Sequence, residues 1–103
     1  MLCAQPFPMV WMEMVRLRTT GAHLKDVYEL LFEAAKCVET EKDLVRLRIY
    51  GSVSLPTDIA ISLVWDIRPE VDSGSRAGLS ICDSLKSFGL VDHSIWMEKT
   101  PPP

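Results

Sequence analysis

The sequence predicts an α+β domain in which a four-stranded antiparallel sheet carries two helices on one of its faces. Three segments alternate apolar and polar residues and a fourth alternates large and small residues, as strands do. Two others repeat apolar residues at three- and four-residue spacing, as amphipathic helices do. The six segments follow in the order strand-helix-strand-strand-helix-strand. At 103 residues and 11.6 kDa the chain has the size of one domain. We therefore expect residues 1–103 to form a single domain with a core of about residues 10–99.

The first strand is predicted for Met9–Thr19, which is rich in β-prone residues. Aliphatic side chains alternate with arginines in its sequence VRLR, residues 15–18. Glu13 breaks this alternation, because it falls on the same side of the strand as Val15. A β-bulge at this point or a change of register near Met12 would each explain it, and the sequence leaves both open.

The first helix is predicted from Leu24 to Val38. The turn sequence Thr19-Thr20-Gly21 precedes it and offers a helix N-cap. Its apolar stripe consists of Leu24, Val27, Tyr28, Leu31, Phe32, Ala35 and Val38. Charged residues occupy the other side, so the stripe is expected to pack against the sheet.

The sequence VRLR occurs again as residues 45–48, inside a second predicted strand, Leu44–Tyr50. Alternation along this strand places Val45 and Leu47 toward the helices and Leu44 on the opposite face with the arginines. The two copies of VRLR are therefore interpreted as two strands that each show arginine on one face.

The C-terminal half supplies a third strand, Asp58–Ile67, a second helix near Ser75–Ser87 and a fourth strand, Leu90–Lys99. The apolar face of this helix is expected to hold Leu79, Ile81, Cys82, Leu85 and Phe88. Ser73 or Ser75 is suited to cap its start, and Gly89 to end it. The prolines after the fourth strand form a tail that cannot continue inside a sheet.

Right-handed crossovers place the first and third strands in the middle of the sheet, in the order 4-1-3-2, with both helices on one face. This is the ferredoxin-like plan. The opposite face stays open, and the residues expected on it are Met12, Met14, Arg16, Arg18, Leu44, Arg46, Arg48, Tyr50, Ala60, Ser62, Val64, Asp66, Asp92, Ser94, Trp96 and Glu98. This face is too apolar to be fully solvated and too charged to be a dry core, which favours an interface.

The candidate ligand-binding residues all come from this open face: Arg16, Arg18, Arg46, Arg48, Asp66 and Trp96. A guanidinium fork suits a carboxylate or phosphate, so the arginines could clamp an anion. The alternative is that they pair with Asp66, Asp92 and Glu98, on neighbouring strands or across a dimer. This alternative is favoured here, because opposite-charge cross-strand pairs are routine in sheets.

Other candidate sites are weaker. His93 could act as a general base beside a carboxylate, but alternation turns it toward the helices, which favours a satisfied core histidine. His23 falls in the first turn of the first helix. The segment from Ser73 to Gly78 could hold an anion at a helix N-terminus, although ordinary capping by a serine is favoured.

Composition narrows the possible partners. A net charge of −3 and a pI near 5.3 argue against a general nucleic-acid binder and against a polybasic membrane surface. Cys3, Cys37 and Cys82 lack the spacing of a disulfide framework, a zinc site or an iron–sulfur cluster. No segment has the length of an apolar membrane span or the layout of a signal peptide. We expect a cytoplasmic protein with reduced thiols, no metal and no cofactor.

The pattern resembles the dimeric α/β-barrel superfamily, which includes stress-responsive A/B-barrel proteins and antibiotic-biosynthesis-type monooxygenases. The resemblance covers roughly Val10–Lys99 and rests on element order, length and the half-apolar open face; TDIAISLVWD and FGLVDHSIW fit its third and fourth strands. It implies a homodimer formed by two apposed sheets. Some oxygenases and haem-degrading members of the group use an asparagine, and this chain contains none, so no catalytic residue is transferred.

The resulting hypothesis is a small homodimeric barrel-type protein that binds a small organic ligand between the apposed sheets. One alternative is a cofactor-independent monooxygenase or isomerase that uses Arg16, Arg46, Asp66 or Trp96. A second alternative is an RNA-binding open sheet, on which bases would stack on Tyr50 and Trp96.

Overall fold

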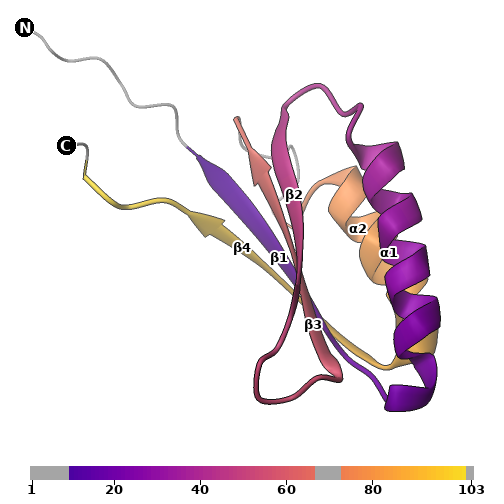
Figure 1. Ribbon diagram of the computed structural model, residues 1–103. Helices are drawn as coiled ribbons and strands as arrows, with labels where there is room; N and C mark the ends of the chain where they lie inside the picture. The colour runs from indigo at the N-terminus through magenta and orange to yellow at the C-terminus, as the bar shows by residue number, and fades with distance from the viewer. Residues whose placement is uncertain (1–9, 67–72, 102–103) are drawn as a thin grey trace, which may run out of the picture.

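The computed structural model describes residues 10–66 and 73–101 and shows a two-layer α+β sandwich. Its elements follow in the order β1 (Trp11–Arg18), α1 (Leu24–Val38), β2 (Leu44–Gly51), β3 (Asp58–Trp65), α2 (Arg76–Leu85) and β4 (Leu90–Met97). A 3-10 turn precedes α1 and another continues α2. Both helices cover one face of the sheet, and within residues 10–66 and 73–101 no helix or strand covers the other (Figure 1).

The sheet is antiparallel throughout and has the order β2-β3-β1-β4. This confirms the predicted order, read from the opposite edge. Val15 on β1 lies between Ile61 on β3 and His93 on β4, which fixes the register of the central strands. The predicted elements are all present. β1, β3, α2 and β4 are a few residues shorter than expected, α1 has the expected bounds, and β2 runs one residue further, to Gly51.

The expected start of the first strand at Met9, the expected end of the third strand at Ile67 and the last two residues of the proline tail lie outside the described residues. At the start of α2, Ser75 is the N-cap, and its hydroxyl accepts a hydrogen bond from the amide of Gly78 at 2.9 Å. Among the described residues, no helix is long and apolar enough to span a membrane.

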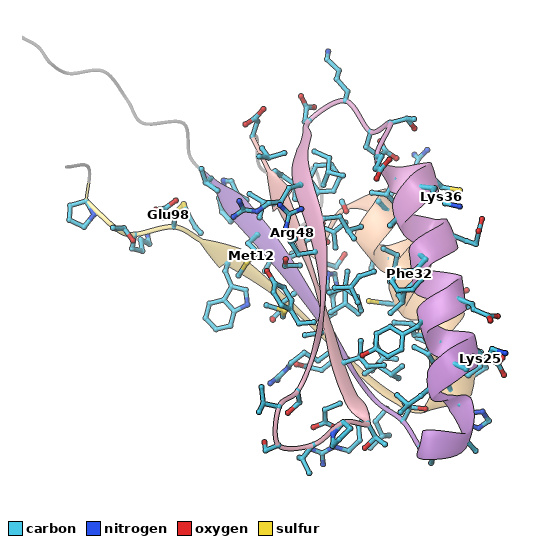
Figure 2. The ribbon with its side chains drawn as sticks, viewed as in Figure 1. Met12, Lys25, Phe32, Lys36, Arg48 and Glu98 are labelled. Atoms are coloured by element: carbon cyan, nitrogen blue, oxygen red, sulfur yellow. The ribbon has the colours of Figure 1, made fainter. Side chains whose placement is uncertain are left out.

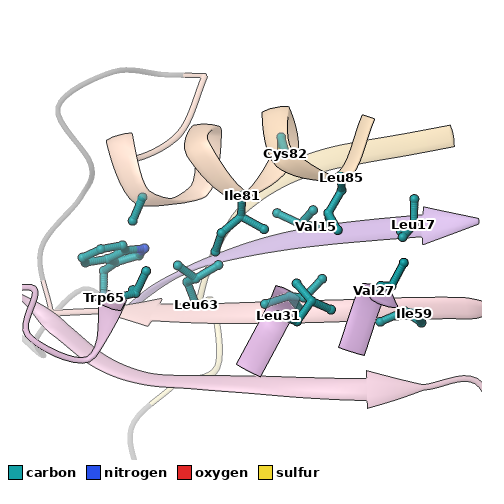
Figure 3. Close-up of a cluster of buried hydrophobic side chains, with 13 residues drawn as sticks. Val15, Leu17, Val27, Leu31, Ile59, Leu63, Trp65, Ile81, Cys82 and Leu85 are labelled. Carbon is teal, nitrogen blue, oxygen red and sulfur yellow. The ribbon is translucent and has the colours of Figure 1, made fainter. Parts of the chain in front are cut away.

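A single apolar core lies between the helices and the sheet (Figure 3). Val15 and Leu17 of β1 and Ile59, Ile61 and Leu63 of β3 are at most 1% exposed. Helix α1 adds Val27, Leu31 and Val38, and α2 adds Ala77, Ile81, Cys82 and Leu85. The sequence assigned Phe32 and Leu79 to the buried faces of the two helices. These two assignments were wrong, because the side chains are 55% and 40% exposed.

The irregularity of the sheet lies in β2 rather than in β1. The pairing of β1 with both neighbours continues without a break through Glu13, so neither the bulge nor the register change expected there occurs. Instead, the register of β2 against β3 shifts between Leu44 and Arg46. Leu44 consequently packs on the core and Val45 is 50% exposed, so the expected orientation of these two residues was wrong.

Candidate functional site

The open face of the sheet is built from four rows of side chains that cross the strands. Its apolar residues are Met12 and Met14 of the central strand β1, Val64 of the central strand β3 and Trp96 of the edge strand β4. Val64 is only 9% exposed and Ser62 beside it 3%, although no helix or strand of the described part of the chain covers them. Met12 and Arg48 lie on the side of the sheet away from α1 (Figure 2). This face is therefore a partly desolvated surface.

A hollow of about 470 Å³ occupies the end of this face where β1 and β2 finish and β3 and β4 begin. Its floor includes Ala60, which stands in the row between Tyr50 and Arg16. The small alanine between two long side chains leaves the space open. Arg18 and Leu90 belong to the wall at the next row.

Two ion pairs line the hollow. Arg16 donates from Nε and Nη2 to Oδ2 of Asp92 at 3.1 and 2.7 Å. Arg18 donates from Nε and Nη2 to the two carboxylate oxygens of Asp58, both at 3.2 Å. The hydrogen bond and the charge of Asp58 raise the pKa of Arg18 above its ordinary value. Both arginines thus meet acidic cross-strand neighbours, which was the favoured alternative to a free anion clamp.

The other four predicted site residues lie outside the hollow lining. Arg48 donates to the carbonyl oxygen of the preceding residue at 3.4 Å, and Trp96 donates to Oγ of Ser94 at 2.8 Å. Arg46 and Asp66 are exposed, and within the described parts of the chain neither side chain makes a hydrogen bond or ion pair. The structure therefore brings together only Arg16 and Arg18 of the predicted set.

The hollow is also lined by residues that were not predicted as site residues, among them Tyr50, Asp58 and Asp92. The strand order and register expected from the sequence could have identified the two aspartates. Asp58 begins β3 directly opposite Arg18, and Asp92 lies opposite Arg16, so the antiparallel register alone pairs them.

A second polar cluster, which we call the Glu13 cluster, lies on the helix-covered face and consists of Glu13, Trp65, Ser75 and His93. The Glu13 side chain is completely buried. Its Oε2 accepts from Trp65 Nε1 at 2.7 Å and from the Ser75 hydroxyl, and its Oε1 accepts from the Ser75 amide at 2.8 Å. Oε1 also lies 2.9 Å from Nε2 of His93. The carboxylate thus ties β1 to β3, β4 and the start of α2.

Two glycines make room for this carboxylate. A Cβ atom at Gly78 would lie 2.3 Å from Glu13 Oε1, and one at Gly74 would lie 2.2 Å from the His93 ring. Gly74 also has a φ of 121°, which disfavours other residues. The glycines before and inside α2 are therefore explained by the close approach of the helix start to Glu13.

The Glu13 cluster has the character of a structural anchor. The Ser75 hydroxyl donates a hydrogen bond to Glu13 and accepts one from the Gly78 amide as the N-cap of α2. Burial, followed by the negative charge of Glu13, raises the pKa of the nearby Cys82 thiol and keeps it protonated. His93 faces the helix side as expected, and the carboxylate that satisfies it is Glu13. No group of three or more potential metal ligands occurs among the described residues.

No family model and no curated protein matches this chain. Solved structures do match it. A conserved protein from Methanosarcina mazei Go1 superposes with a TM-score of 0.73 at 11% identity, covering 86% of this chain and 92% of that one. A variant of SnoaB, a cofactor-independent oxygenase from Streptomyces nogalater, gives 0.72 at 15% identity and 91% and 97% coverage.

A third structure, an antibiotic biosynthesis monooxygenase, gives a TM-score of 0.68 at 11% identity, covering 89% of this chain and 99% of that one. Each comparison spans nearly the whole of both chains. At such low identities, the likeness concerns the fold alone. The chain thus has a ferredoxin-like fold, which it shares with these structures.

Proposed function

We propose that this protein forms a homodimer by apposing two open sheet faces, and that it binds a small organic ligand in the space between them. The observation that carries this proposal is the uncovered, half-apolar sheet face with a 470 Å³ hollow at one end. Contiguous exposed apolar patches mark interaction sites, and pockets of this volume suit small molecules.

The chemistry of the hollow narrows the kind of ligand. Arg16 and Arg18 are already neutralised by Asp92 and Asp58, so a simple anion would have to displace a carboxylate to reach either guanidinium. A molecule with an apolar body over Ala60 and hydrogen-bonding groups at its edge fits the lining better. The Tyr50 ring, 50% exposed, offers further contact area.

The test combines molar mass by light scattering with native mass spectrometry of the same sample. We expect a dimer that retains a small molecule. Ala60→Phe should fill the hollow and abolish retention, whereas Ser84→Phe, on the exposed side of α2, should not. A monomeric protein, or equal retention by both variants, would contradict the proposal.

A cofactor-independent oxygenase is the second candidate, and the likeness to SnoaB supports it. Two observations weigh against it. The chain contains no asparagine, and the ionisable side chains of the hollow are engaged in ion pairs with one another, apart from the Tyr50 phenol. Oxygen uptake with the retained molecule as substrate would favour the oxygenase, and uptake at the level of a protein-free blank would favour binding alone.

RNA binding is the least favoured alternative. Tyr50 and Trp96 lie on the two edge strands, and the central strands place Met12, Met14 and Ala60 on the open face. Base stacking uses aromatic side chains along the middle of such a sheet.

We also propose a cytoplasmic location, where Cys37 and Cys82, both free thiols, would stay reduced.

A further inference from the structure

The two edges of the open face carry opposite charges. Edge strand β2 contributes Arg46 and Arg48 to this face and no carboxylate. Edge strand β4 and the residue after it contribute Asp92 and Glu98 and no basic residue. The charge therefore changes from positive to negative across the sheet, from β2 to β4.

Much of this edge charge is not neutralised within the chain. Among the described residues, Arg46, Arg48 and Glu98 form no ion pair, and all three are exposed. Arg48 contacts only a backbone carbonyl. Glu98 extends the sheet by one residue, because its amide donates to the carbonyl of Val10 at 3.0 Å. Glu98 lies on the same side of the sheet as Met12 and Arg48 (Figure 2).

We infer that the partner of this face is a second copy turned about a twofold axis that runs nearly parallel to the strands. This orientation places β2 of each copy over β4 of the other. Since the rotation keeps each row of residues in place, Arg46 then lies opposite the partner's Trp96 and one row from the partner's Glu98, and the contact is made twice by symmetry. The inference rests on the proposed homodimer and specifies its orientation.

The geometry of face-to-face sheets permits these contacts. Packed sheets lie about 10 Å apart, which long arginine and glutamate side chains can bridge from both sides. The same rotation brings the two hollows opposite each other, because residues keep their position along the strand direction. An axis across the strands would instead place β2 over β2 and bring arginines against arginines, which is repulsive.

Charge reversal tests the orientation. In homodimers of Arg46→Glu/Arg48→Glu, acidic residues would meet Glu98; in homodimers of Glu98→Arg, arginines would meet arginines. We expect each variant alone to dimerise at least about tenfold more weakly than the original protein. Mixed together, the two variants should form a heterodimer, and the combined triple variant should regain the homodimer. High salt should weaken these effects.

Lys25→Glu/Lys36→Glu is the matched control, because it makes the same charge change on α1, on the far side of the molecule (Figure 2). It should leave the dimer intact. Unchanged dimerisation of both open-face variants, or a mixture without heterodimer, would overturn the orientation while the sheet-to-sheet dimer still stood. A preferred heterodimer between the original protein and Arg46→Glu/Arg48→Glu would indicate β2 over β2. An original protein that is monomeric would overturn both proposals.

Discussion

At the scale of single residues, Glu13 connects β1 with β3, β4 and the start of α2. Its carboxylate is fully buried and accepts hydrogen bonds from Trp65 and Ser75 while contacting His93. All these partners can act as donors, so the position requires a group that only accepts. Leaving a buried donor without an acceptor costs more than an ordinary hydrogen bond contributes.

Glu13→Gln should therefore destabilise the protein by about 2 to 4 kcal/mol. The amide has nearly the same shape, but its NH₂ group would oppose two donors. Urea unfolding measures the effect, and Glu29→Gln on the exposed side of α1 is the control. A loss no larger than that of the control would show that the carboxylate is not needed.

Gly78→Ala should lower the free energy of unfolding, whereas a glycine-to-alanine change inside a helix usually raises it. Alanine inside a helix normally stabilises by about 1 kcal/mol relative to glycine. Here the new Cβ would lie 2.3 Å from Glu13 Oε1, so we expect a loss of about 1 to 3 kcal/mol. Gly21→Ala, where no atom lies within 4 Å of the Cβ position, should cause no comparable loss in the same thermal unfolding assay. Equal melting temperatures for the two variants would contradict this account.

At the scale of elements, the bulge in β2 decides which side chains of that strand reach the core. Leu44 contacts the core cluster, whereas Val45 is half exposed. The bulge lets the strand begin with a leucine on the helix side and still place Arg46 and Arg48 on the open face.

Leu44→Ala should accordingly cost about 1 to 2 kcal/mol, less than a fully buried leucine, because Leu44 is only partly buried. Val45→Ala should change the free energy of unfolding by less than about 0.5 kcal/mol. Denaturant unfolding of both variants checks this order. The reverse order would mean that regular alternation continues through Val45.

At the scale of the whole molecule, the question is what covers the open face. Met14 lies at its apolar centre, between Ser62 and Ser94. A charge introduced there would be buried in an apposed dimer but would meet water in a monomer.

Met14→Asp should therefore yield a folded monomer by light scattering, with unchanged far-ultraviolet circular dichroism. Leu79→Asp makes the same kind of change on an exposed position of α2 and should leave the dimer mass unchanged. A dimeric Met14→Asp variant would mean that the open face is not the interface.

Sequence periodicity determined the order of the elements and the face on which each arginine of the strands lies, and the right-handed crossover rule then gave the strand order. These features follow from local patterns, because a period of two or of 3.6 residues assigns each side chain to a face. The same alternation correctly placed Glu13 and His93 on the helix side, yet a buried carboxylate there looked like an error of register.

Only the tertiary structure showed that Glu13 is satisfied there. Its partners come from β3, from β4 and from the start of α2, up to 80 residues away in the chain. The hollow likewise depends on the small Ala60 standing between side chains of two other strands. Such features are set by register and by distances between distant segments, which no local pattern encodes.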